Sequence, residues 1–316
     1  MSETTASLQR KISSAGDLQS VVRTMKALAA SSVGQYEKSV HALGDYYRTV
    51  ELGLGACFRA GPMRGPGAEP KEPADATAIG AVVFGSDQGL VGQFNDIIAD
   101  HAITTLATLP GKLHVWAVGE RVHARLADAG LTPIGLFTVP NSVRTITPLV
   151  GQIQIESEAH RTEGENAQLY VFHNRLQTGS FYEPVSEHLL PLDAAWAQRL
   201  TQTPWPTHVL PEVVGDRTAT LRALIREFLF ISLFRACAES LASENASRLA
   251  AMQRADKNIE DLLETLHGTF HRLRQSGIDE ELFDVISGYE ALATGPKSGS
   301  GNEPPQGNRH SAGGRP

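Results

Sequence analysis

Apolar and small residues recur every seven positions at both ends of this chain, and this repeat constrains the fold more than any other feature. The first series consists of Leu8, Ala15, Val22, Ala29, Tyr36, Leu43 and Val50. A second series follows members of the first by four residues, at Ile12, Val33, Val40, Tyr47 and Leu54. Two rows with this offset give a 3.5-residue period, which predicts a coiled-coil helix. The far end repeats in the same way, at Met252, Ile259, Leu266 and Leu273, with Ala255, Leu262, Leu263 and Phe270 at the alternate positions.

Two such helices are too long for a compact globule. At 1.5 Å per residue the first would measure about 80 Å, and a second running from after Pro211 to about Leu292 would measure about 120 Å. A compact chain of this size has a radius of gyration of only about 20 Å. Because a whole domain separates the two helices in sequence, we expect the chain to fold back and pair them antiparallel.

Between the helices, strand-like and helix-like patterns alternate from residue 78 to about residue 210. Strand patterns cover 78–85, 113–119, 134–139 and 168–174, and helical patterns start at Leu90, Glu120 and Arg144. This alternation predicts a mainly parallel sheet with crossover helices, and a further strand or two is expected at 187–192. The expected fold is α/β, with a long antiparallel coiled coil of N- and C-terminal helices and a central Rossmann-like α/β domain.

Five segments follow from these patterns. Residues 1–55 form the first coiled-coil helix, 78–210 the α/β domain and 211–293 the second coiled-coil helix. The Gly/Pro/Ala-rich residues 56–77 are interpreted as a flexible linker, and residues 294–316 as a disordered tail.

Composition excludes several classes of function. The 316 residues carry 28 Lys and Arg against 35 Asp and Glu, a net charge of -7, which argues against nucleic acid as the main partner. Cys57 and Cys237 lie far apart without neighbouring Cys or His, so neither a disulfide framework nor a zinc site is indicated. No apolar run reaches the ~18 residues of a membrane span. We expect a soluble protein that can dock on a membrane complex.

The glycine-rich segment GSDQGLVGQFN, residues 85–95, is the first place to look for a ligand site. It follows a strand and opens a helix, as phosphate-binding loops do. It lacks the lysine of GxxxxGK[ST], and the spacing of Gly85, Gly89 and Gly92 is not GxGxxG. A tight strand-to-helix turn is the favoured interpretation, with nucleotide binding as the alternative. We expect no catalytic residue, no cofactor and no metal ion.

Three stretches, taken together, resemble one family. They are RTMKALAAS (residues 23–31), the turn GSDQGLVGQFN, and SLASENASRLAAM (residues 240–252) followed by HRLRQSGIDEE (residues 271–281). Read in this order they resemble the gamma subunit of F-type ATP synthases, with Gln88 and Val91 where that family usually has Arg and Cys. The resemblance extends over most of residues 8–292. It implies a non-catalytic central rotor stalk that couples rotation of the membrane c-ring to conformational change at catalytic sites on the beta subunits.

The resemblance also implies partners. The paired helices would occupy the hole of a hexamer of alternating alpha and beta subunits, and the α/β domain would sit beside epsilon and the c-ring. Arg274 and Gln275 match the family's catch-loop contact with beta, and Met25 and Lys26 match the segment that faces the lever region of beta. The acidic balance, the long linker and the tail indicate a divergent bacterial branch, such as the alternative F-type ATPases. The protein would then be peripheral, on the cytoplasmic face of the bacterial inner membrane.

Two other classes of function remain open from the residues alone. One is a small-molecule or nucleotide-binding α/β protein with the helices as an oligomerisation device, which requires the middle domain to bind nucleotide by itself. The other is a coiled-coil scaffold unrelated to ATP synthase. That interpretation leaves the SLASENA and RQ segments unexplained.

Overall fold

The long terminal helices expected from the heptads are present. The computed structural model describes residues 4–59, 78–160, 168–177, 181–192, 194–209, 211–212 and 215–293. Helix α1 covers Thr5–Arg59 and helix α6 covers Arg217–Ala293. Residues 60–77 of the expected linker and the expected tail, 294–316, lie outside the described residues. The chain divides into a large compact unit, Gly16–Glu260, and a smaller one formed by the start of α1, up to Ala15, and the end of α6, from Asp261.

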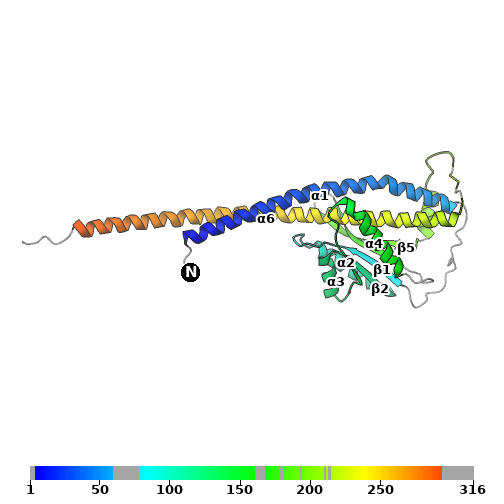
Figure 1. The fold of residues 1–316 in the computed structure, drawn as a ribbon, viewed down its shortest axis with the longest axis horizontal. Coiled ribbons are helices and arrows are strands. Elements are labelled where there is room, and N and C mark those ends of the chain that lie inside the picture. Colours follow the sequence, from blue (N-terminus) through cyan, green and yellow to red (C-terminus); the bar gives the residue numbers. More distant parts are fainter. Residues whose placement is uncertain are drawn as a thin grey trace, which may run out of the picture. The chain divides into compact units, whose positions relative to one another are not determined.

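Within the large unit, α1 and α6 run alongside each other (Figure 1). Lys26 Nζ of α1 lies 2.6 Å from Asp256 Oδ2 of α6, and farther along α1 the Tyr46 hydroxyl donates a 2.6 Å hydrogen bond to Glu227 Oε1. Positions advance along α1 as their partners recede along α6, so the helices are antiparallel, as the sequence predicts. Among the described residues, no helix is apolar over a stretch long enough to cross a membrane.

Burial follows the heptad rows. Six of the seven positions in the first row are at most 8% exposed, and Leu43 is partly buried; Leu54 of the second row is fully buried. On α6, Met252 and Ile259 are buried, but Leu262 is 50% exposed whereas Leu263 is partly buried. Consecutive helical residues point about 100° apart, so these two leucines cannot share one seam position. The expectation that Leu262 fills the seam is therefore wrong.

The central domain holds one five-stranded sheet. Its strands are β1 (Ala78–Phe84), β2 (Lys112–Val118), β3 (Gly135–Phe137), β4 (Gln168–Leu176) and β5 (Tyr182–Leu190). The order is β3-β2-β1-β4-β5, with every neighbouring pair parallel except β4 and β5. The helices are α2 (Phe94–Leu106), α3 (Glu120–Asp128), α4 (Ile146–Ala159) after the short 3-10 turn η1 (Val143–Thr145), and α5 (Ala194–Gln202).

Strand β5 and helices α2 and α5 differ from the sequence prediction. Strand β5 begins five residues before the predicted strand at 187, because its first residues are half exposed at the sheet edge and show little hydrophobic alternation. Helix α2 starts at Phe94 rather than Leu90, since the intervening residues form a turn. Helix α5 was not predicted at all; its single well-buried residue in the described range is Leu200.

Strand β1 explains how the domain is layered. Its sequence AIGAVVF is almost continuously apolar, which suits a central strand covered on both faces. One face, with Ile79, Ala81 and Val83, packs against α2 and α3. The other face, with Val82 and Phe84, packs in a core that also includes α1, α4 and α6. The sheet therefore lies directly on the coiled coil.

Helix α6 is buried nearly all round between Phe228 and Ser247. In this stretch only four residues are even partly exposed, because the sheet covers one side of the helix and α1 covers another. The small residues here, such as Ala238, Ala242 and Ala246, let both neighbours approach closely.

Candidate functional site

The glycine-rich turn joins β1 to α2 and is filled by its own side chains. The Ser86 amide donates to Asn95 Oδ1 at 2.9 Å, and Asn95 Nδ2 donates back to Ser86 Oγ at 2.8 Å. Ser86 is fully buried. A Cβ at Gly85 would lie 2.4 Å from the Cβ of Val122, so a glycine is required there. The Ser86 amide is therefore already paired with Asn95, which favours the interpretation as a tight turn.

The Asp87 side chain links the turn to the segments that follow β2 and β3. Its Oδ1 accepts the Glu120 amide at 3.0 Å, and its Oδ2 accepts the Val139 amide at 2.9 Å. Glu120 opens α3 after β2, and Val139 follows β3, so one carboxylate joins the carboxyl ends of three adjacent strands. Both oxygens are occupied by backbone donors, which gives Asp87 a structural role.

Four polar residues on α6 are spaced four apart, so that they form one ridge along the helix. We call Arg235, Glu239, Ser243 and Ser247 the polar ridge. In its C-terminal half, Ser243 Oγ donates to the carbonyl of Asn174 at 2.9 Å, and Ser247 Oγ donates to the carbonyl of Val91 in the glycine-rich turn. Both serines are buried, so these bonds are shielded from water.

The N-terminal half of the ridge is ionic. Glu239 Oε2 lies 2.7 Å from Arg175 Nε and 2.8 Å from His173 Nε2, both on β4. Glu187 Oε1 of β5 lies 2.7 Å from Arg175 Nη2 and 2.8 Å from Arg235 Nη2. Burial by itself would raise the pKa of Glu239, but the hydrogen bonds from His173 and Arg175 outweigh it and lower that pKa to about 2. Glu239 is therefore firmly ionised at neutral pH.

Met25 and Lys26, predicted to face a beta subunit, are both partly buried on α1. Lys26 and Arg23 both pair with Asp256 of α6, at 2.6 Å and 3.1 Å. The hydrogen bond from Lys26 is the main reason that the pKa of Asp256 lies below its ordinary value. The Lys26 ammonium thus already contributes to the coiled coil.

Met25 lies within a wider apolar stripe on α1. Leu18, Val21 and Leu28 are 54%, 55% and 64% exposed and, with Met25, follow the three- and four-residue spacing of one helix face. This face is distinct from the seam positions Val22 and Ala29, which are buried. The stripe is available for contact with another molecule.

Arg274 and Gln275, predicted to contact beta, are exposed on α6 and belong to the smaller unit, whereas Met25 and Lys26 belong to the larger one. Every residue from 274 to 290 is exposed. The large apolar residues in this stretch are 48–75% exposed: Ile278, Leu282, Phe283, Val285, Ile286 and Tyr289. Arg274 and Gln275 therefore begin a bare helical segment with an apolar surface.

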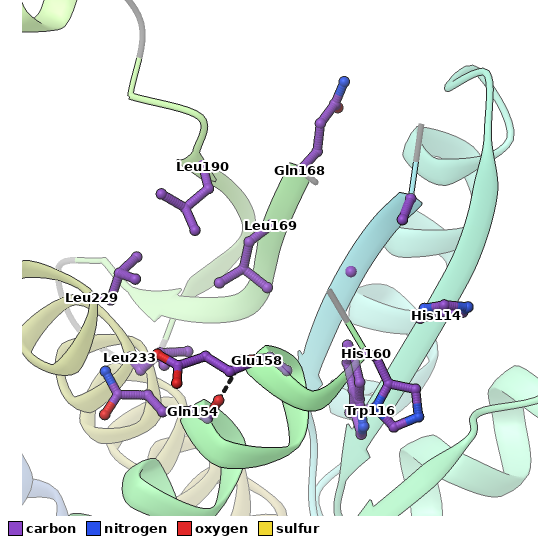
Figure 2. Close-up of a pocket in the computed structure, with 13 residues that line it drawn as sticks. His114, Trp116, Gln154, Glu158, His160, Gln168, Leu169, Leu190, Leu229 and Leu233 are labelled. Atoms are coloured by element: carbon purple, nitrogen blue, oxygen red, sulfur yellow. Dashed lines mark hydrogen bonds between the residues drawn. The ribbon is translucent and has the colours of Figure 1, made fainter. Parts of the chain in front are cut away.

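A small pocket lies at the amino ends of the parallel strands, far along the strands from the glycine-rich turn. Figure 2 shows Leu229 and Leu233 of α6 on one side of it and Trp116 and His160 on the other. Its free volume is about 20 Å³, roughly that of one water molecule. Ligands of such sheets usually bind at the carboxyl ends of the strands. Neither size nor place suits a nucleotide.

Sequence reasoning missed the polar ridge and its partners on β4 and β5. Arg235, Glu239, Ser243 and Ser247 follow a strict four-residue spacing, but Ser240, Glu244 and Asn245 also interrupt the apolar residues of this stretch. From sequence alone such a row is ordinarily the solvent-facing side of a helix, so the pattern did not reveal that these residues are paired with the domain. What it faces depends on residues far away in the chain.

Known proteins agree with this architecture. A family model described as ATP synthase matches residues 4–292. A chain from the central stalk and c-ring structure of Tetrahymena thermophila mitochondrial ATP synthase is 18% identical with a TM-score of 0.52, and the match covers 74% of this chain and 99% of that one.

Two structures of the Euglena gracilis mitochondrial enzyme also match. A chain from the rotor in rotational state 1 is 15% identical with a TM-score of 0.54, covering 87% of this chain and 98% of that one. A chain from the OSCP/F1/c-ring structure in rotational state 3 is 16% identical with a TM-score of 0.59, covering 96% and 99%. At these identities the structures show a shared fold, while the family model spans almost the whole sequence. The chain belongs to the ATP synthase gamma-subunit family.

Proposed function

We propose that this gamma subunit is the central rotor stalk of an F-type ATP synthase, which couples rotation of a membrane c-ring to conformational change at catalytic sites on beta subunits. The observation that carries the proposal is the bare C-terminal end of α6. As a gamma subunit the chain is non-catalytic. Its work in this proposal is mechanical.

The bare end of α6 needs a partner. An isolated helix gains little stability in water without packing, and exposed apolar patches on a soluble protein mark interaction surfaces. Leu282 and Phe283 are 58% and 72% exposed, and consecutive helical residues point about 100° apart. The apolar surface therefore extends around a wide arc of the helix, which suits a sleeve of subunits better than a single flat partner.

The candidate contact residues fit such a sleeve. The exposed guanidinium of Arg274 can hold a carboxylate of beta through two hydrogen bonds, and the Gln275 amide can add a directional bond. The apolar stripe around Met25 offers a second contact, on α1, and Lys26, whose ammonium pairs with Asp256, lies beside it. In this proposal alpha and beta surround the coiled coil.

The remaining partners come from the resemblance and from the neighbours' assemblies, which contain F1 and a c-ring. We place the α/β domain, residues 78–210, beside epsilon and the c-ring, with the long helices α1 and α6 as the shaft. The complex would hold the protein at the cytoplasmic face of a bacterial inner membrane, as a peripheral subunit of a divergent bacterial enzyme.

Coexpression with alpha and beta subunits tests the proposal. We expect a stable alpha–beta–gamma complex on gel filtration, and ATP hydrolysis that depends on this chain. Replacing Arg274 and Gln275 together by alanine should leave assembly intact and slow turnover, because each lost charged hydrogen bond is worth about 1.5–3 kcal/mol. Arg272→Ala, an exposed arginine two residues away, is the matched control.

The outcomes separate the parts of the proposal. Failure of the wild-type chain to assemble with alpha and beta would refute the stalk function. Unchanged turnover in the double variant would remove Arg274 and Gln275 from the mechanism, and equal slowing by Arg272→Ala would show a nonspecific effect of lost charge.

A further inference from the structure

The polar ridge bonds the coiled coil to the α/β domain at four successive levels. Arg235 reaches β5, Glu239 and Ser243 reach β4, and Ser247 reaches the glycine-rich turn. From the first to the last of these residues the helix advances about 18 Å at 1.5 Å per residue. A single helix row thus contacts three separate elements of the domain.

Elsewhere the long helices and the domain share further hydrogen bonds, from Gln154 of α4 to the Arg226 carbonyl and from Arg59 of α1 to the Thr201 carbonyl, but next to the ridge the contact is apolar. Beside the ridge, α6 presents small residues such as Ala238 and Ala242, together with Leu233 and Leu241, to the core. Apolar burial opposes separation but is non-directional, so by itself it tolerates sliding or rolling of one element on another. Hydrogen bonds need short distances and aligned donors, so they specify one register and one rotational setting.

Slippage would also leave buried groups unpaired. Asn174 is fully buried; its carbonyl accepts from Ser243, and its side-chain amide donates to the Phe94 carbonyl at 3.0 Å. Glu239 is largely buried beside His173, which is completely buried. A shift of one helical turn would separate these partners, and an unpaired buried polar or charged group is costly. The ridge therefore makes intermediate positions unfavourable.

We propose that the polar ridge is the element that transmits torque between the coiled coil and the α/β domain, by holding the domain at a fixed rotational setting on α6. The inference rests on the proposed function for its mechanical meaning. Under load, the ridge keeps the end that meets the membrane ring turning in step with the end that drives the catalytic subunits. Its residues position the domain and take no part in chemistry.

The test replaces Ser243 and Ser247 by alanine in the complete membrane complex. Alanine favours the helix and adds no bulk. The substitutions remove the Ser243 hydroxyl, which contacts the carbonyls of Asn174 and Glu239, and the Ser247 hydroxyl, which donates to the Val91 carbonyl. ATP hydrolysis by the alpha–beta–gamma complex should stay at the wild-type level, whereas ions pumped per ATP in vesicles should fall severalfold. Ser240→Ala is the matched control: Ser240 is buried on the same helix, and its hydroxyl has no hydrogen-bond partner among the described residues.

A disulfide between positions 92 and 247 should restore the coupling that the loss of the hydrogen bonds reduces. A Cβ at Gly92 would lie 3.6 Å from Ser247 Oγ, so cysteines at these two positions can join the turn to α6. In the Ser243→Ala background, Gly92→Cys with Ser247→Cys should pump poorly when reduced and regain coupling when oxidised. The backbone strain of a cysteine at Gly92, where φ is 59°, is present in both states and cancels.

Hydrogen exchange on the full chain tests, without partner subunits, whether the polar ridge holds the domain on α6. Only the lost Ser247 bond reaches the turn, at the Val91 carbonyl, so its loss should raise opening of the turn, and with it exchange at amides 85–95, by about fivefold. Normal pumping by the Ser243→Ala, Ser247→Ala complex, equal loss in Ser240→Ala, no rescue on oxidation, or unchanged exchange would each overturn the proposal. If the wild-type chain fails to assemble, the stalk function fails, and the exchange result alone decides whether the ridge holds the domain.

Discussion

Replacing Glu239 by glutamine should destabilise the fold by an amount that the structure lets us estimate. Glutamine resembles the protonated acid, so the variant lacks the charge that His173 and Arg175 stabilise. The pKa of Glu239 falls from 4.5 to about 2 on folding. At about 1.36 kcal/mol per pKa unit, this shift corresponds to about 3 kcal/mol of unfolding free energy at neutral pH.

The sign of the pH dependence follows from the same shift. The folded pKa lies below the unfolded one, so the stabilisation is complete above pH 4.5 and disappears as the pH falls through 2. Wild type and Glu239→Gln should therefore differ by about 3 kcal/mol at pH 7 and by only about 1.4 kcal/mol at pH 3. The assay is urea unfolding of the full chain, followed by fluorescence of Trp116 and Trp196 in the core.

The matched control is Glu227→Gln, on the same helix. Glu227 accepts one hydrogen bond from Tyr46, which is 45% exposed, so its loss should cost about 1 kcal/mol or less. A loss below about 1 kcal/mol in Glu239→Gln at pH 7 would refute the argument. So would a difference between wild type and variant that stays constant from pH 7 to pH 3.

Two further predictions concern the close contact at Gly85 and the burial of the two cysteine thiols. Gly85→Ala should lower the free energy of unfolding by about 2 kcal/mol in the same urea assay, because the new methyl group would overlap Val122. Gly89→Ala, where the nearest atom lies 3.8 Å away, should change it by about 0.5 kcal/mol at most, and equal effects would contradict the reasoning. Burial raises the pKa of the Cys57 and Cys237 thiols, so neither should react with a disulfide reagent at pH 8 until urea unfolds the chain; rapid labelling of the native protein would show that the thiols are accessible.

Periodicity predicted the elements whose burial is decided locally. The row from Leu8 to Val50 places one residue on the same face every two turns, so sequence alone identified the buried seam of α1. Strand β1 was predicted from its apolar run, and strand β2, which covers Lys112–Val118, from the apolar run at 113–119. In each case the hydrophobic pattern that predicts the element lies within the element itself.

Contacts between distant residues could not be predicted in this way. Helix α2 starts late because Ser86 bonds Asn95 across the turn, a pairing that no hydrophobic pattern encodes. Val91 and Ser247 are 156 residues apart in sequence, yet they share a hydrogen bond. Their pairing depends on how the sheet lies on α6.

That pairing accounts for two of the three stretches by which the sequence resembles its family. Val91 belongs to GSDQGLVGQFN and Ser247 to SLASENASRLAAM, so these two stretches contact each other, and their composition follows from a contact inside the chain. The segment HRLRQSGIDEE is different. From Arg274 onward its residues are exposed on a helix, and packing among the described residues does not explain why an arginine, a glutamine and a row of apolar residues occupy these positions. Helical propensity alone would be satisfied by many polar sequences. A sequence pattern that internal packing does not require points to contacts with other molecules, which is why the experiments on Arg274 and Gln275 have to be done in the assembled complex.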